Sequence, residues 1–361
     1  MREVPNYADT MIGHHEPFPW EGSEAFAWVP SPLVVRDLSL DTRTLTAAKD
    51  AARSLTASDA RFPTGWAQLN ALLLQTESVG SVRLEDAGRA ATPDAAAALR
   101  AALEPGPLSF ERLNVWHRLL VPGGGARRET QTWVGGASPV DATYVPPPPP
   151  YLEGLMDDLL RFANDEVMNA VAQAAVLHGQ FDAIQPYPDA NGRMGRMLMS
   201  WLLKRRGVID TLPPPISVAL RRDLGGYLSG LHLFREGRHQ PLITTVGRAC
   251  QAAARQSDVM VRQALELVDR WNVQARDLRR DSAARRLIPL IATQPLLDSV
   301  RAAELIDVSE RAARTALHSL AERQILDEVI DEVDAERARG RPRHRYEARE
   351  LLELTATWVA S

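Results

Sequence analysis

The sequence predicts a mainly helical protein. Apolar side chains recur at helical spacing in two central segments, residues 152–159 and 194–202, and residues 45–103 form an alanine-rich stretch with the same period. One short β-hairpin is expected at residues 133–144, because a Gly-Gly pair there supplies turn chemistry. These features favour a helical core that carries one hairpin.

Composition and charge exclude several classes of protein. Hydrophobic residues make up 45% and charged residues 24% of the chain, which excludes a disordered or fibrous protein, and 361 residues suit two or three domains. The net charge of −4 gives no overall field toward nucleic acid or anionic lipid, so such binding would require a local patch. Cys250 is the single cysteine, which excludes an internal disulfide and a thiolate metal cluster. The sequence shows no signal region and no long apolar stretch, so we expect a cytoplasmic protein without a membrane partner.

Changes in composition divide the chain into four expected parts. The first fifty or so residues hold scattered prolines and aromatics without a sustained period, which indicates an extended arm. Five prolines at residues 146–150 suit a stiff connector or spacer. A charged stretch at residues 262–286 has the pattern of a single connecting helix. The expected parts are an N-terminal arm and helical region, a helical core, a helical linker and a small C-terminal domain, at residues 1–105, 106–255, 256–286 and 287–361.

The most informative segment lies between two helical patterns, at residues 178–196 (HGQFDAIQPYPDANGRMGR). Pro186 and Pro188 end the first helix, and Asn191-Gly192 supplies the turn that opens the second. Backbone N–H groups at the start of a helix lack intrahelical partners, and the helix dipole favours an anion there. The segment therefore predicts an anion-binding helix start.

Charged side chains around this helix start suit the phosphates of a nucleotide. Arg193 and Arg196 are three residues apart and so share one face of the helix. Asp189, just before them, can hold the hard divalent cation that accompanies nucleotide phosphates. Taken alone, the Asn-Gly-Arg triplet would suit an ordinary capped helix with surface arginines. The joint spacing of six residues favours the phosphate site: Asp189, Asn191, Gly192, Arg193, Gly195 and Arg196.

This pattern resembles the signature of the Fic family, H-P-F-x-D-G-N-G-R-x-x-R, which follows a helix with the motif H-x-x-F-x-x-I. The preceding helix here offers His178, Phe181 and Ile184, and residues 185–196 read QPYPDANGRMGR. The resemblance extends in coarse helix pattern over residues 108–250 and implies a Fic-type helical core. It also implies protein AMP transfer, in which ATP is split between its α and β phosphates and AMP moves to a hydroxyl of a target protein.

The resemblance assigns roles to individual residues, with ATP as the substrate and Mg²⁺ as its cofactor. Asp189 would hold Mg²⁺ between the α and β phosphates, Arg193 would contact the β phosphate, and Arg196 the γ phosphate. The remaining nucleotide-binding positions, which include contacts to phosphate oxygens, are Asn191, Gly192 and Gly195.

Two positions depart from the family signature. Ala190 replaces a glycine, and alanine tolerates a left-handed backbone poorly. Gln185 stands where the family has its catalytic histidine, and a neutral amide has no basicity to remove a proton from the attacking hydroxyl near pH 7. Because a positioned base contributes about 10²–10⁴-fold, we expect nucleotide binding with weak or absent AMP transfer.

An inhibitory motif is expected upstream of the core. Many members of the family carry [S/T]-x-x-x-E-[G/N] on a helix, and residues 81–86 read SVRLED. By resemblance, Glu85 would pair with Arg196 with support from Ser81, and an incoming triphosphate would displace this carboxylate. The alternative is that both are ordinary polar residues of an alanine-rich helix, and Asp86 departs from the motif.

The hairpin expected at residues 133–144 corresponds to the flap of the family, which clamps a segment of the target protein as an added strand. Main-chain hydrogen bonds of this kind say little about which protein is held. A hairpin that only packs on the core is the alternative. A homodimer is a further expectation from the resemblance, because Fic proteins often associate.

The C-terminal domain resembles a winged helix. Residues 300–306, a short turn and a helix that begins after the N-cap Ser309 form the helical part, and residues 329–333 suit a strand. DNA contacts would come from the second helix and a basic wing, through Arg311, Arg314, Arg341, Arg343 and Arg345. Six acidic residues at 327–336 oppose such contact, so a dimerisation or protein-docking module is the alternative.

The leading hypothesis is a Fic-type protein adenylyltransferase that uses Mg-ATP and is impaired at Gln185. The runner-up is a catalytically silent, nucleotide-responsive DNA-binding regulator. Gln185 could be engineered, could mark a natural silent member, or could belong to a chemistry that needs no base there. His178, two helical turns upstream, is expected to be a structural core histidine rather than a replacement base.

Overall fold

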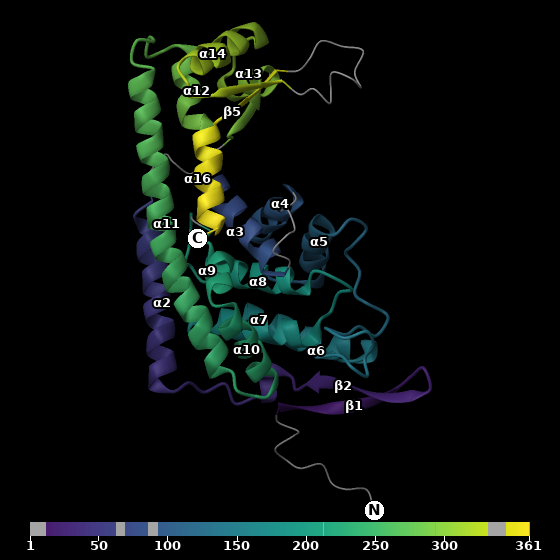
Figure 1. The fold of residues 1–361 in the computed structure, drawn as a ribbon. Coiled ribbons are helices and arrows are strands. Elements are labelled where there is room, and N and C mark those ends of the chain that lie inside the picture. Colours follow the sequence, from purple (N-terminus) through teal and green to yellow (C-terminus); the bar gives the residue numbers. More distant parts are fainter. Residues whose placement is uncertain are drawn as a thin grey trace, which may run out of the picture. The chain divides into compact units, whose positions relative to one another are not determined.

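The computed structural model describes most of the chain. The described residues are 12–62, 69–85, 93–211, 213–292, 294–330 and 344–360. The chain divides into two compact units, residues 1–60 with 77–255 and residues 61–76 with 256–361, while the finer division into four parts stays a prediction. The fold is mainly helical, as the sequence predicts, and its described residues include two small antiparallel sheets (Figure 1). None of the helices in the described ranges combines the length and apolarity needed to cross a bilayer.

The first unit begins with a β-hairpin where the sequence predicts an extended arm. Strands β1 (Gly13–Trp20) and β2 (Ser23–Pro30) pair antiparallel along their whole length. Glu21 and Gly22 form the two-residue turn, with φ of 44° and 82°, in the left-handed region that such a turn requires. Two prolines interrupt β1 and remove N–H donors, which hides the strand pattern in the sequence. The expected arm is therefore corrected to a hairpin.

Two buried helices form the centre of this unit. Helix α7 (Ala170–Ile184) is buried along its whole length, including its few polar side chains, because other helices surround it. Helix α8 (Asn191–Arg205) packs beside it (Figure 1). Asn169 starts α7 as an N-cap, since its side chain accepts hydrogen bonds from the N–H groups of Val171 and Ala172.

Further helices pack around this pair. Helices α2 (Thr42–Ala60), α6 (Leu152–Asn164) and α10 (Leu224–Arg235) all contact α7. The other helical elements of the described residues up to 274 are η1 (Leu33–Val35), α3 (Asn70–Glu85), α4 (Pro93–Ala102), α5 (Phe110–Leu120), η3 (Pro149–Tyr151), α9 (Ile216–Arg222) and α11 (Gln240–Gln274). The first residues of α3 and the last part of α11 belong to the second unit. Helix α11 ends at Gln274, so the single connecting helix predicted to reach residue 286 stops earlier than expected.

The segment expected to be the flap, residues 133–144, is a loop closed by one β-bridge. Val134 pairs with Tyr144, and the N–H of Val134 donates to the carbonyl of Tyr144 at 2.8 Å. Gly135 and Gly136 follow with φ of 70° and 73°, which is the turn chemistry that the sequence predicts. The segment therefore has the connectivity of a hairpin without regular strands.

The second unit contains the small C-terminal sheet. Its elements beyond α11 are α12 (Ala283–Ile291), β3 (Leu296–Asp298), α13 (Ser299–Ile306), α14 (Glu310–Glu322), β4 (Asp327–Ile330), β5 (His344–Glu347) and α16 (Arg349–Ala360). Strand β5 lies between β3 and β4 in an antiparallel sheet. The predicted N-cap Ser309 is confirmed, because its hydroxyl accepts a hydrogen bond from the N–H of Ala312 at 3.3 Å. The predicted wing residues Arg341 and Arg343 lie outside the described residues.

Candidate nucleotide-binding site

The loop between α7 and α8 is held by its own hydrogen bonds. Gln185 and Ala190, at its two ends, both have left-handed backbones, with φ of 48° and 62°. Ala190 stands where the family signature has glycine, and its left-handed backbone costs roughly 1–2 kcal/mol. Asn191 closes the loop, because its Oδ1 accepts from the N–H of Tyr187 at 3.0 Å and its Nδ2 donates to the carbonyl of Tyr187 at 2.7 Å. The predicted phosphate contact of Asn191 stays a prediction.

The first turns of α8 bring two arginines to one place. Arg193 and Arg196 are both buried, with 8% and 2% of their side-chain surface exposed. Gly192 lies beside them, and a Cβ at this position would stand 2.6 Å from Glu85 Oε1 and 3.1 Å from Arg196 Nη1. Only glycine fits here unless a neighbour moves. The start of α8 therefore combines first-turn N–H groups, which have no intrahelical partner, with two guanidinium groups.

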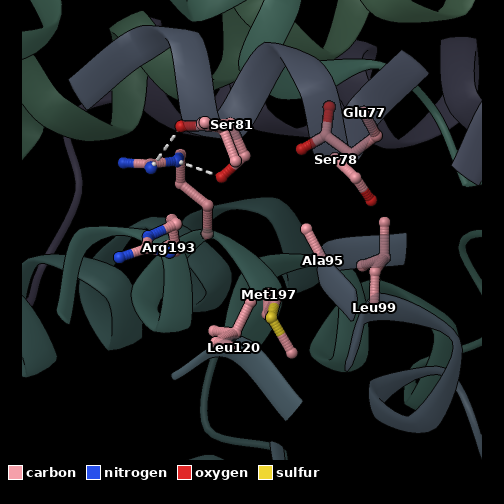
Figure 2. A pocket seen from close by; sticks show the side chains of 10 residues that line it. Glu77, Ser78, Ser81, Ala95, Leu99, Leu120, Arg193 and Met197 are labelled. Carbon is pink, nitrogen blue, oxygen red and sulfur yellow. Dashed lines mark hydrogen bonds between the residues drawn. The ribbon is translucent and has the colours of Figure 1, made fainter. Parts of the chain in front are cut away.

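A carboxylate from α3 joins the two guanidinium groups. Glu85 Oε1 accepts a hydrogen bond from Arg196 Nη2 at 2.8 Å, and Glu85 Oε2 accepts one from Arg193 Nε at 3.0 Å. Ser81 adds two acceptors for Arg196, its Oγ for Nε and its backbone carbonyl for Nη2, both at 2.8 Å (Figure 2). The contacts with Arg196 that the resemblance implies for Glu85 and Ser81 are thus present. The second ion pair, with Arg193, is not part of the predicted motif.

Arg193 keeps an unused donor. Its Nη2 is buried and has no hydrogen-bond partner within the described part of the chain, although Asp189 Oδ1 lies 3.6 Å away. A buried charged donor without a partner is costly. This atom is therefore available to an acceptor such as a phosphate oxygen.

Asp189 lies at the open side of the site. Its side chain is 62% exposed, and its Oδ1 accepts a hydrogen bond from the N–H of Ala190 at 2.6 Å. The described residues hold no group of three or more His, Cys, Asp or Glu side chains arranged for a metal ion. A single exposed carboxylate nevertheless fits Mg²⁺, which commonly binds through one or two carboxylates together with substrate phosphates and water.

His117 is a neighbour of this site that no pattern in the sequence predicts. Its Nε2 lies 3.1 Å from the carbonyl of Asp189, and its Nδ1 accepts from the N–H of Gly125 at 2.8 Å, so Nε2 carries the proton. Its ring stacks on Tyr187 with centroids 4.2 Å apart. Burial lowers the pKa of His117, which keeps the ring neutral. Nothing local in the sequence indicates a contact between helix α5 and this loop.

Gln185 occupies the position where the family has its base. Its Nε2 donates to the carbonyl of Asp182 at 2.9 Å and to Asp182 Oδ1 at 3.2 Å, which leaves its Oε1 as an acceptor. Asp182 is itself paired with Arg235, and Arg128 Nε donates to the carbonyl of Gln185 at 2.7 Å. An amide oxygen held in this way can orient a hydroxyl but has no basicity to take its proton.

His178 lies in the core between α7 and α8. It is fully buried, its Nε2 lies 2.7 Å from the hydroxyl of Tyr227, and burial lowers its pKa to about 4. Gly195 faces it so closely that a Cβ would stand 2.3 Å from His178 Nδ1. The structure therefore gives Gly195 a packing contact, and its predicted place among the nucleotide-binding residues stays a prediction.

The predicted DNA-contact residues are only partly described. Arg311 and Arg314 are exposed on α14, and Arg314 pairs with Glu310 at 2.7 Å. Arg345 is exposed on β5. DNA binding by the second unit stays a prediction.

Comparison with known proteins identifies the domain that holds this site. Residues 107–203 match the model of the Fic/DOC family. A probable protein adenylyltransferase of Aquifex aeolicus (strain VF5) is 30% identical over 125 residues, which cover 34% of this chain and 34% of that protein. The protein adenylyltransferase Fic of Drosophila grimshawi is 35% identical over 123 residues, which cover 33% of this chain and 23% of that protein.

This chain thus spans about a quarter to a third of the length of these curated relatives. The crystal structure of a Fic family protein from Desulfovibrio desulfuricans G20 aligns with a TM-score of 0.49 and 17% identity, covering 87% of this chain and 98% of that chain. The sequence match at residues 107–203 includes both α7 and the site-bearing start of α8. Residues 107–203 therefore form a Fic/DOC-family domain.

Proposed function

We propose that this domain binds the triphosphate of ATP at the start of α8 and transfers AMP to a hydroxyl of a target protein. Two residues keep the rate of AMP transfer low, Glu85 and Gln185. The observation that carries the proposal is the convergence of Arg193 and Arg196 on one carboxylate from another helix. Two buried guanidinium groups that share an anion suit a multiply charged anion such as a triphosphate. The protein adenylyltransferase names of the relatives support ATP as the nucleotide.

Each residue of the site has a separate role in the transfer of AMP. Arg196 holds the γ phosphate, Arg193 the β phosphate, and the first N–H groups of α8 add further donors. The hydroxyl oxygen of the target attacks the α phosphorus, the bond between that phosphorus and the α–β bridging oxygen breaks, and pyrophosphate leaves. The hydroxyl proton must go to a base, and Gln185 offers only a hydrogen-bond acceptor. Transfer by this chain is therefore slow.

Asp189 is the residue that would hold Mg²⁺. Its exposed carboxylate stands on the same side of the loop as Arg193, so a metal ion there would lie beside the phosphates. When bound, the ion neutralises charge on the phosphate oxygens.

Glu85 restrains the site by occupying both arginines. A triphosphate that binds Arg196 and Arg193 has to displace two charge-assisted hydrogen bonds of 2.8 and 3.0 Å. We therefore assign α3 the role of an inhibitory helix.

The segment at residues 133–144 is proposed to hold the target. Val134 and Val140 are 44% and 57% exposed, so this loop presents apolar side chains next to its single β-bridge. An extended target segment could add hydrogen bonds to that bridge.

The test is transfer of label from α-labelled ATP to protein. The parent chain, Gln185→His, Glu85→Gly and the double variant are compared, with Arg196→Ala added to the double variant as the control. We expect the strongest labelling in the double variant and a loss of labelling in the control. Absence of label in the double variant, when ATP still binds, would refute AMP transfer.

A second function, a silent nucleotide-responsive regulator that binds DNA, is favoured by two observations. Gln185 is fixed by Asp182 in a form that cannot act as a base. The second unit has the order of helices and strands expected for a winged helix, with Arg311 and Arg345 exposed. DNA affinity that falls with salt, changes with ATP and is weakened in an Arg311→Ala variant would support this function. No binding to DNA at low salt would remove it.

A further inference from the structure

Glu77 is a buried carboxylate on α3 that the proposed function does not use. It is 3% exposed and lies about two helical turns before Glu85. Its Oε2 accepts a hydrogen bond from the N–H of Ser217 at 2.8 Å, and its Oε1 accepts one from the Ser217 hydroxyl. Ser217 is fully buried near the start of α9, where the N-cap residue Pro215 gives no side-chain cap. Glu77 therefore satisfies a backbone N–H that α9 cannot satisfy itself.

The next turn of α3 lies against α9 with no space between them. A Cβ at Gly80 would stand 2.6 Å from Val218 Cγ2 and 3.0 Å from the Val218 nitrogen. Glycine at this position permits the close approach of the two backbones. Ser81, the following residue, holds Arg196.

Residues 77–85 of α3 are thus attached at two places. One attachment, through Glu77 and Gly80, is to α9, and the other, through Ser81 and Glu85, is to α8. Figure 2 shows Glu77 and Ser81 on the same helix at the edge of a small cavity. The apolar side of that cavity is formed by Val82, Ala95, Leu99, Leu120 and Met197.

We propose that Glu77 and Ser217 form an anchor that keeps the inhibitory helix over Arg196, with Glu77 as a positioning residue that acts through Glu85. The inference rests on the proposed inhibitory role of Glu85. A triphosphate competes directly with Glu85, whereas the hydrogen bonds between Glu77 and Ser217 use no donor of the phosphate site. While the anchor holds, the displaced Glu85 stays close to the arginines and competes for them. When the anchor is broken, the helix end can move away, and ATP meets less competition.

Two variants break the anchor by different chemistry. Ser217→Ala removes one donor to Glu77. Gly80→Ala removes no polar group and improves intrinsic helix propensity, so any effect comes from the collision with Val218. Ser200→Ala, which removes a buried hydroxyl from α8, is the matched control. The measurements are the Kd of ATP by calorimetry and the hydrogen exchange of amides 78–85.

Both variants should tighten ATP binding by about three- to tenfold, because each weakens helix docking. Ser217→Ala removes a hydrogen bond to the Glu77 carboxyl, and Gly80→Ala introduces a Cβ that collides with Val218. Amides 78–85 should exchange faster in both variants, and the control should match the parent chain. In a Glu85→Gly background neither variant should tighten binding further, since the carboxylate that competes for both arginines is then absent.

The outcomes separate this inference from the proposed function. If Glu85→Gly leaves the Kd of ATP unchanged, the proposed inhibition by Glu85 is wrong, and the anchor positions no inhibitory group. If Glu85→Gly tightens binding while Ser217→Ala and Gly80→Ala do not, only the anchor is overturned. Further tightening in the Glu85→Gly background would also overturn it, because the effect would not pass through Glu85.

Discussion

Replacement of Glu85 by glycine should tighten the binding of ATP by about 30-fold. Glu85 makes two charge-assisted hydrogen bonds, at 2.8 Å to Arg196 and 3.0 Å to Arg193. Bonds of this kind contribute about 1.5–3 kcal/mol each, but the Glu85 side chain is 31% exposed and water screens part of that energy. A total of about 2 kcal/mol therefore opposes the triphosphate, which corresponds to about 30-fold in Kd.

Calorimetric titration with ATP and with AMP tests this value. The affinity for AMP should not change, because AMP lacks the β and γ phosphates that compete with Glu85. Glu153→Gly, which removes an exposed glutamate from the first turn of α6, is the matched control. An ATP affinity within the error of the parent chain, or an equal gain for AMP, would show that Glu85 does not compete with the β and γ phosphates.

Three further predictions follow from the site and its surroundings. Gln185→His should raise AMP transfer by about 10²–10⁴-fold, since it restores a base; equal labelling of the two proteins would contradict this. Gly195→Ala should lower the melting temperature, because the new Cβ would stand 2.3 Å from a ring nitrogen of His178. An unchanged melting temperature would show that α7 and α8 are loosely packed at this point. Burial raises the pKa of Glu77 from 4.5 to about 7. Between these pH values the folded protein keeps a proton that the unfolded chain releases. The free energy of unfolding therefore falls by about 3 kcal/mol as the pH rises from below 4.5 through 7. Denaturant midpoints at pH 5 and pH 8 should differ less in Glu77→Gln than in the parent chain, and equal differences would contradict that assignment.

The parts of the fold that were predictable from sequence have local causes. Helix α8 follows from its apolar periodicity, and the loop before it follows from two prolines and the Asn191-Gly192 turn. The N-cap at Ser309 follows from its position before an apolar helical face. The hairpin of β1 and β2 was missed because its prolines break the strand pattern, although Gly22 marks its turn.

The site was predictable only in part, because several of its contacts join distant segments. The pairing of Glu85 with Arg196 came from family resemblance, since no periodicity connects helix α3 to helix α8. His117 and Glu77 carry no motif, and their contacts with Asp189 and Ser217 arise from tertiary packing. Such contacts are visible only once the helices are placed in space.

Binding of a polyphosphate at the start of α8 can be measured through the dependence of affinity on the number of phosphates in the ligand. The Kd values of ATP, ADP, AMP and adenosine are compared in the Glu85→Gly variant, with and without Arg196→Ala. We expect affinity to rise with each added phosphate and Arg196→Ala to remove the advantage of ATP over ADP. Equal affinity for ATP and adenosine, or an ATP advantage that survives Arg196→Ala, would contradict polyphosphate binding at the start of α8.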